Sequence, residues 1–349
     1  MTRALKAGHL QKMSEQAANK PQEFAREFFQ ISQRYTEQNS VSTTIALGEE
    51  AITLAVDDKT PIGALIREAF ITSEKPSTFT LQIWDSSQGD ALPDLSWAKD
   101  YLFQDIVVPR SVSGALRIAF DKSQGFIYVY DPTTNFGSIW MRDHSLLAYA
   151  SFITPFRLMM SWMANNFSGE IIHASAIGVG DRGVLINGPS GSGKSTLGLH
   201  AALKGYPVLA DDVALLSKSK IYSVYSRAKA QSSSTPLSLK NLATFEIADM
   251  TNGKTVIPFN NFGEKFLRSI DLRVLVLPIF AHLSHYEKLQ PGVALKLLAP
   301  NSLRELFGGS PENFLRLSQL TKTTPAYRLA LSEDSERNFE NLLRIVEQS

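Results

Sequence analysis

Residues 183–212 read GVLINGPSGSGKSTLGLHAALKGYPVLADD, and this stretch decides how the second half of the chain folds. It opens with the short, mostly apolar run Gly183–Asn187, which predicts a buried strand. The next eight residues, Gly188–Ser195, match the pattern G-x-x-x-x-G-K-[ST] at every position. A helix is predicted to begin at Ser195 and to stop at Gly205, since glycine is common just beyond a helix end. Strand, loop and helix therefore occur in the order that a phosphate-binding loop requires.

The residue types in this loop suit a bound anion. Its glycines let the backbone turn tightly and bring N–H groups against phosphate oxygens. Lys194 would place a cation near the β- and γ-phosphates of a nucleotide, and the Ser195 hydroxyl can complete the shell of a Mg²⁺ ion. The positive end of the following helix would point at the same anion. The expected cofactors are ATP and Mg²⁺, and the residues expected to contact the nucleotide are Gly188, Pro189, Ser190, Gly191, Ser192, Gly193, Lys194, Ser195 and Thr196.

An acidic pair follows the next predicted strand, Pro207–Ala210, at Asp211 and Asp212. Beside a phosphate loop, one carboxylate can hold Mg²⁺ directly or through water while the other accepts the proton of an attacking hydroxyl. A loop cap is the alternative role for such a pair. Adjacent strand residues point to opposite faces, so the two side chains converge only if the backbone turns just after Ala210.

Two more residues are candidates for contacts with phosphate or substrate. His173 lies on the predicted strand Ile171–Ile177, which should form a hairpin with Gly183–Asn187; a lone strand histidine is otherwise a core residue. Arg227 begins the polar stretch 227–234, which is either a linker or a loop that closes over phosphates. Arg227 is the first choice for a phosphate or acceptor contact among the cations Arg227, Lys229, Lys254, Lys265 and Arg268.

Composition narrows the classes of partner. The chain has 349 residues and a net charge of +1, so no strong field attracts it to nucleic acid or to a membrane surface, and neither is expected as a partner. It has no cysteine, which excludes disulfides, thiolate zinc sites and cysteine nucleophiles and suits a cytoplasmic protein. The first 20 residues lack an apolar core of signal-peptide length, and no run approaches the ~20 apolar residues of a membrane span.

The hydrophobic pattern divides the chain into two domains that combine α/β and α+β classes. Residues 1–143 predict an α+β domain with a mostly antiparallel sheet and an amphipathic helix over Pro21–Glu37. An apolar helical bridge follows over 144–168, kinked or divided at Pro155. Residues 169–349 predict a phosphate-loop domain with a mixed sheet. Within it, Leu295–Leu298 is expected as a strand, Asn301 as the cap of a helix to Phe307, Ser310 as the start of a second helix, and Asp334 as part of the start of the last.

His173, the loop Gly188–Ser195 and the pair Asp211-Asp212 together resemble the HPr kinase/phosphorylase family, which is related to phosphoenolpyruvate carboxykinase. That family carries a histidine on the strand before the loop, a G-x-S-G-x-G-K-[ST] loop, and paired aspartates about one helix later. The resemblance covers about residues 171–216, is weaker over the rest of the C-terminal half and is absent from the first 143. It implies a kinase domain of the HPr kinase type in which Asp212, Asp211, His173 and Lys194 are catalytic, with Asp212 as the base and Ser195 and Asp211 linked to the metal.

The sequence departs from the HPr kinase pattern at two points, and these departures leave the expected substrate less specific. Thr196 stands where HPr kinases have Glu, and their Gly- and Arg-bearing signature further along is not found. The leading hypothesis is an ATP-dependent kinase that phosphorylates a hydroxyl, on a serine-bearing protein or peptide or on a small molecule. The alternative is a nucleotide-binding module whose ATP state controls a partner, with little transfer. A carboxykinase is a poor third hypothesis, since no separate oxaloacetate site is found. A homo-oligomer is compatible with any of these three functions.

Overall fold

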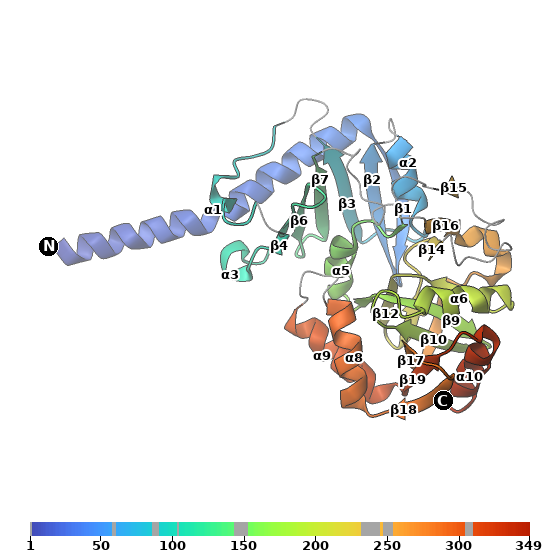
Figure 1. Cartoon of the computed structure of the whole chain (residues 1–349). Coiled ribbons are helices and arrows are strands. Elements are labelled where there is room, and N and C mark those ends of the chain that lie inside the picture. The colour runs from blue at the N-terminus through green and yellow to red at the C-terminus, as the bar shows by residue number, and fades with distance from the viewer. Residues whose placement is uncertain are drawn as a thin grey trace. The chain divides into compact units, whose positions relative to one another are not determined.

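The computed structural model describes two compact units, and each is treated by itself (Figure 1). The described residues are 2–57, 61–85, 91–102, 105–142, 153–231, 245–246, 254–303 and 310–349. The first unit contains Met1–Ile45, Glu50–Arg67 and Ser73–Leu147, and the second contains Ala46–Glu49, Glu68–Thr72 and Ala148–Ser349. Both mix helices with strands, so the chain is an α/β protein. The predicted boundaries at residues 143 and 168 stay a prediction.

The first unit is built on a seven-stranded sheet in the order β1-β2-β3-β7-β6-β5-β4. Its strands are β1 (Ser40–Leu47), β2 (Glu50–Asp57), β3 (Phe79–Asp85), β4 (Ile106–Val107), β5 (Arg117–Asp121), β6 (Phe126–Asp131) and β7 (Phe136–Met141). Strands β4 to β7 form an antiparallel meander, whereas β2–β3 and β3–β7 are parallel pairs. The sheet is therefore mixed, although the three antiparallel pairs of the meander outnumber the two parallel ones. Its other helices are α2 (Pro61–Glu68), α3 (Arg110–Ser113) and the 3₁₀ turn Ser96–Ala98.

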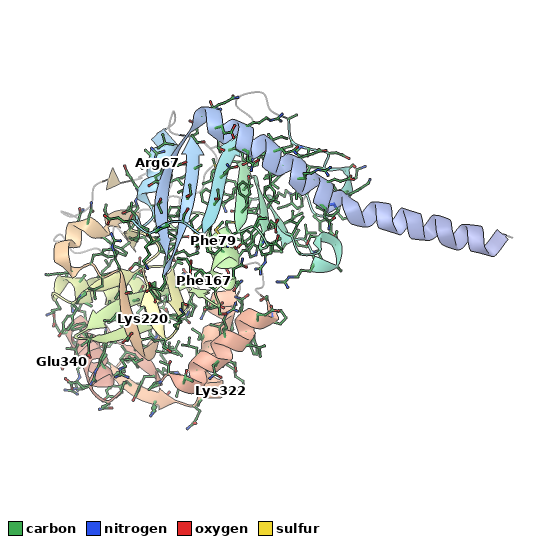
Figure 2. The ribbon with its side chains drawn as sticks, turned by 180° about the vertical axis from the view of Figure 1, so that it is seen from behind. Arg67, Phe79, Phe167, Lys220, Lys322 and Glu340 are labelled. Atoms are coloured by element: carbon green, nitrogen blue, oxygen red, sulfur yellow. The ribbon has the colours of Figure 1, made fainter. Side chains whose placement is uncertain are left out.

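Helix α1 (Thr2–Asn39) packs on this sheet against β2, β3 and β7 (Figure 2). The predicted apolar stripe is core: Phe24 and Phe28 are buried, and the Phe28 ring meets Trp84 of β3 edge to face. The predicted start at Pro21 is wrong, because the helix runs through it from Thr2. Residues 2–20 are rich in Ala, Leu, Lys, Gln and Glu, which are strong helix formers, and their preference outweighs the one hydrogen bond that proline removes.

The second unit holds the main sheet, in the order β11-β9-β10-β17-β13-β12-β8, with β19 also pairing β17 and β18 pairing β19. Its strands are β8 (Glu170–Ile172), β9 (Ala174–Val179), β10 (Arg182–Asn187), β11 (Val208–Ala210), β12 (Ala214–Ser217), β13 (Lys220–Tyr222), β17 (Ser269–Phe280), β18 (His285–Leu289) and β19 (Ala326–Leu331). Strands β10, β17 and β19 are parallel neighbours, and β9 is antiparallel to both β10 and β11. The carboxyl ends of β10, β11, β17 and β19 therefore meet at one edge of the sheet.

Helices cover both faces of this sheet. They are α5 (Arg157–Asn165), α6 (Lys194–Leu203), α8 (Pro291–Leu303), α9 (Pro311–Thr323) and α10 (Ser335–Glu347). Strand alternation decides which core each residue enters: Val184 and Ile186 pack with α6 and α10, while Leu185 packs with α8 and α9. Among the described helices of either unit, none combines the length and apolarity needed to span a bilayer.

Capping residues predicted where helices begin more reliably than short apolar runs predicted strands. Ser310 caps α9 in a capping box with Asn313, and Asp334 caps α10 through the Arg337 N–H, as expected. The strand predicted at Leu295–Leu298 is wrong, because these residues lie inside α8. A run of four residues with three leucines fits a strand or a helix equally well, and tertiary packing decides. Asn301 also lies within α8 rather than at its cap, and the expected helix end at 307 is outside the described residues.

The polar stretch at 227–234, expected as a linker or loop, is partly a strand. Residues Arg227–Gln231 form β14, which pairs antiparallel with β16 (Lys254–Pro258) in a small sheet completed by β15 (Phe245–Glu246). A 3₁₀ helix, Phe259–Lys265, follows β16. Residues 232–234 lie outside the described part of the chain. Strand β14 thus holds its side chains at regular positions, which matters for the site.

Candidate functional site

The predicted loop joins β10 to α6 at the carboxyl end of β10. Gly191 and Gly193 have φ angles of 80° and 93°, in the left-handed region that glycine tolerates best. A Cβ atom at Gly193 would lie 2.6 Å from the Leu331 Cδ1 atom, so any side chain there would also force Leu331 to shift. Gly193 also precedes α6 without any capping side chain. The first N–H groups of that helix therefore remain oriented toward the loop, which suits an anion.

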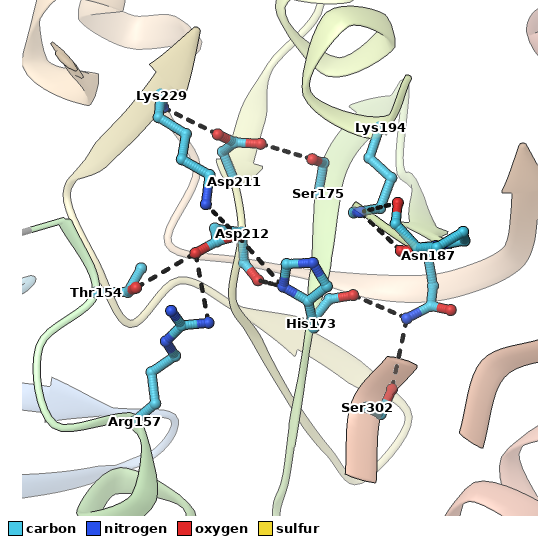
Figure 3. Close-up of polar contacts among 12 residues, drawn as sticks. Thr154, Arg157, His173, Ser175, Asn187, Lys194, Asp211, Asp212, Lys229 and Ser302 are labelled. Carbon is cyan, nitrogen blue, oxygen red and sulfur yellow. Dashed lines mark hydrogen bonds and ion pairs between the residues drawn. The ribbon is translucent and has the colours of Figure 1, made fainter. Parts of the chain in front are cut away.

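Two polar side chains of the loop are held in unusual states. The buried Lys194 ammonium donates to the carbonyl oxygens of Gly188 (2.7 Å) and Pro189 (3.0 Å), inside the loop's own curve (Figure 3). Ser192 is 6% exposed, and its Oγ atom has no hydrogen-bond partner among the described residues. A buried polar group without a partner costs about 1–3 kcal/mol. Both groups would gain from an anion in the loop.

The backbone turns where the sequence required a turn. Strand β11 ends at Ala210, and Asp212 has a φ of 73°, a conformation that Asp adopts more readily than most residues. Both carboxylates are buried and contact Lys229 of β14: its backbone N–H donates to Asp211 Oδ2 at 3.0 Å, and its Nζ lies 2.6 Å from Asp212 Oδ1. Asp211 Oδ1 also accepts the Ser175 hydroxyl at 2.7 Å. The two aspartates therefore converge.

Three basic side chains surround the Asp212 carboxylate (Figure 3). Its Oδ1 lies 2.6 Å from Lys229 Nζ and 3.3 Å from His173 Nδ1. Its Oδ2 lies 3.6 Å from an Arg157 nitrogen and accepts the Thr154 hydroxyl at 3.4 Å. Burial raises the pKa of Asp212, but Arg157, Lys229 and His173 lower it more, so the net pKa falls well below its ordinary value. Asp212 is ionised at neutral pH.

His173 lies between two strands rather than on the continuous strand predicted over Ile171–Ile177. The chain changes sheet partner there, because β8 pairs with β12 while β9 pairs with β10 and β11. The ring Nδ1 lies 2.8 Å from the Asp212 carbonyl oxygen, and the His173 carbonyl accepts the Asn187 amide at 2.8 Å. Both neighbours of Nδ1, a carbonyl and a carboxylate, only accept, so Nδ1 carries the proton. In the neutral ring, Nε2 is then the acceptor.

Asn187 connects the loop to this cluster. It is the last residue of β10, and its amide nitrogen bonds the His173 carbonyl while lying 3.5 Å from the Ser302 hydroxyl. Its Oδ1 is buried and has no hydrogen-bond partner in the part of the chain that the structure describes. A chain of contacts therefore runs from the start of the loop through Asn187 and His173 to Asp212 (Figure 3).

Arg227 is placed elsewhere than the sequence suggested. It is buried at the start of β14 and pairs with Glu68 at 3.2 Å; burial lowers its pKa, and the Glu68 charge opposes that change. Lys229 takes the position beside the aspartates. Alternation places both residues on one face of β14, roughly 7 Å apart along the strand, and only Lys229 is level with Asp212. Of the other candidate cations, Lys265 and Arg268 are exposed, and the Lys254 side chain lies outside the described residues.

Arg157 was missed by sequence reasoning, although a signal existed. It is the only charged residue in the apolar stretch 146–165, LLAYASFITPFRLMMSWMAN. A lone cation in such a segment is rarely buried unless it is paired. The sequence could have shown that Arg157 needs a partner, but it could not name Asp212.

Comparison with known proteins gives little support for any particular family. No protein-family model matches the chain. No curated protein sequence matches it either. Among solved structures, the Hpr(Ser) kinase/phosphatase from Coxiella burnetii is similar with a TM-score of 0.27 and 13% sequence identity, covering 52% of this chain and 99% of that one. These values indicate a distant relation at most.

Proposed function

We propose that this chain is a Mg²⁺-dependent kinase that transfers the γ-phosphoryl group of ATP to a hydroxyl of a protein, peptide or small molecule, and that residues 169–349 form a phosphate-loop domain of the HPr kinase type. One observation carries the proposal. At the shared edge where β10 and β11 end, a glycine loop with a buried lysine is linked through Asn187 and His173 to a pair of buried aspartates. Phosphoryl transfer requires this kind of positioning and charge neutralisation and little covalent help from the protein.

The loop is proposed to bind the triphosphate. The Ser192 hydroxyl, which has no partner among the described residues, and the start of α6, which no side chain caps, support this, because both present donors to the loop. Lys194 would leave the carbonyl oxygens of Gly188 and Pro189 for the phosphate oxygens, exchanging neutral acceptors for charged ones. Ser190 and Thr196, at the tip of the loop and in the first turn of α6, would complete the contacts.

The donor set fits a Mg²⁺ ion that arrives with the nucleotide. Among the described residues, no group of three or more His, Cys, Asp or Glu could hold a metal by itself. Mg²⁺ in such sites is bound through one or two carboxylates together with substrate phosphates. Each Asp211 oxygen accepts one hydrogen bond and keeps a lone pair, so Asp211 and Ser195 fit as its ligands. The ion would supply neutralisation of the phosphate charge.

Asp212 is proposed to accept the proton of the attacking hydroxyl as the new P–O bond forms and the bond to ADP breaks. Its lowered pKa makes it a weak base while the basic side chains face it, since a general base works best with a pKa near the operating pH. Lys229, the nearest at 2.6 Å, is proposed to turn from Asp212 to the γ-phosphoryl oxygens. That movement would raise the pKa of Asp212 when substrate is present.

The same basic side chains favour a second candidate, a nucleotide switch with little transfer. If they stay on Asp212, the carboxylate remains a structural anion and the ATP state alone would control a partner. This candidate predicts tight ATP binding, negligible turnover, and partner affinity that differs between ATP and ADP.

The test is to incubate the protein with γ-labelled ATP and fractionated cell extract, and to identify labelled products. A product labelled by wild type but not by Lys194→Ala would support the kinase. Binding of ATP without a labelled product in any fraction would reject the kinase and leave the switch.

A further inference from the structure

Strand β17 extends beyond the edge where the loop begins. Ile186 of β10 is level with Val276 of β17. Strand β10 ends one residue later, at Asn187, whereas β17 continues to Phe280. Phe280 therefore stands three residues, or roughly 10 Å, further along than the end of β10. Its neighbour in β19 is Leu331, the residue that packs against Gly193.

The Phe280 ring lies beside the last glycine of the loop while facing solvent. A Cβ atom at Gly193 would lie 3.7 Å from the ring's Cζ atom, at ordinary contact distance. Phe280 nevertheless is 67% exposed. Single exposed apolar residues are common, so exposure alone decides nothing. An open aromatic ring at the point where phosphates would bind is a more specific arrangement.

The order of the strands in the sheet indicates which way a nucleotide bound in the loop would point. The loop follows β10. The aspartate pair follows β11, on one side of it, and Phe280 ends β17, on the other. A γ-phosphoryl group that is transferred near Asp212 must point toward β11. The base, at the opposite end of the nucleotide, then points toward β17.

We propose that Phe280 is the platform on which the base of the nucleotide stacks. The proposal rests on the proposed function, since it needs a triphosphate in the loop. Stacking of a base on an aromatic ring accepts every base, because each has a π-face. Phenylalanine has no hydrogen-bonding group, so Phe280 distinguishes a nucleotide from a bare triphosphate rather than one base from another.

The test compares two ligands on the full chain by equilibrium titration with Mg²⁺ present: ATP and inorganic tripolyphosphate. Phe280→Ala should weaken ATP binding by about 5- to 150-fold and leave tripolyphosphate binding unchanged. Phe280→Trp should keep ATP affinity, and its fluorescence should change with ATP but not with tripolyphosphate. Leu283→Ala is the matched control, because Leu283 is 78% exposed on the same connection to β18 and should leave both affinities unchanged. Thermal unfolding checks that each variant is folded.

The outcomes separate the two proposals. Equal ATP affinity in Phe280→Ala and wild type, with tripolyphosphate bound by both, overturns the platform and leaves the loop site standing. An equal loss of both ligands in Phe280→Ala also overturns it, because the ring would then support the loop rather than the base. Wild type that binds neither ligand overturns the nucleotide site and the platform together.

Discussion

Two buried carboxylates of the second unit, Asp212 and Glu170, have pKa values that are shifted in opposite directions. They are 3% and 4% exposed, and each faces an arginine. The pKa of Asp212 falls well below its ordinary value. The pKa of Glu170 rises, because burial raises it more than the hydrogen bonds from Asn313 and Arg316 lower it. Similar burial thus goes with a lowered pKa for one acid and a raised pKa for the other.

The two pKa shifts differ because the carboxylates contact different numbers of cations, which come from different elements of the fold. Asp212 draws Arg157 from α5, His173 from between β8 and β9, and Lys229 from β14. Among the described side chains, Arg316 is the one cation in contact with Glu170, and it comes from the same helix as Asn313.

Glu170 therefore braces α9 against β8, which is a folding role. Asp212 instead collects charges from three separate elements, and a buried acid perturbed in this way is a candidate for a functional site.

The largest expected effect concerns turnover. Asp212→Asn should lower phosphoryl transfer by about 10²–10⁴-fold, because the amide cannot accept the proton, while ATP binding survives. Glu170→Gln is the matched control and should stay within a few-fold of wild type per folded molecule. Transfer of label from γ-labelled ATP measures both. Wild-type turnover in Asp212→Asn would remove Asp212 from the reaction.

The next effect concerns stability at neutral pH. Arg316→Ala should lower the free energy of unfolding by about 3 kcal/mol, at the low end for a broken buried pair because Arg316 is partly exposed. Arg157→Ala should cost less, since Lys229 and His173 still face Asp212. Urea unfolding of both variants tests this order. A larger loss in Arg157→Ala would show that the arginine, and not the cluster, holds Asp212 ionised.

The pH dependence of stability should have opposite signs at the two carboxylates. The lowered pKa of Asp212 adds stability above the unfolded value of about 3.9, and this is lost as pH falls toward the folded value. The raised pKa of Glu170 works in reverse: stability is lost as pH rises from about 4.3 through the folded value. Subtracting the unfolding curves of Asp212→Asn and Glu170→Gln from wild type should give slopes of opposite sign. Slopes of one sign would contradict the comparison.

The smallest effects belong to the neutral donors. Thr154 bonds Asp212 at 3.4 Å, close to the limit for a hydrogen bond, so Thr154→Val should change stability by less than about 1 kcal/mol. Ser175 bonds Asp211 at 2.7 Å, and Ser175→Ala should cost more, about 1.5 kcal/mol or above. Thermal unfolding at pH 7 resolves the pair. The reverse order would mean that the neutral donor, as well as the cations, sets the state of Asp212.

The sequence determined the parts of this protein that depend on neighbours in the chain. The strand, glycine loop and helix of 183–203 follow from apolar runs and from residues that alone accept left-handed backbone. The caps Ser310 and Asp334 follow in the same way, because a cap bonds an N–H only three residues away. The need for a turn after Ala210 also came from strand geometry.

Only the tertiary structure decided which side chains meet. Arg157 precedes Asp212 by 55 positions and Lys229 follows it by 17, and no local pattern pairs them. The choice of Lys229 over Arg227 depends on where β14 stands beside β11, and the break at His173 on a change of sheet partner. A sequence specifies local backbone preference through short-range sterics and hydrogen bonds. The electrostatic state of a buried acid depends instead on every charge that the fold brings within a few ångströms, and those charges are set by packing.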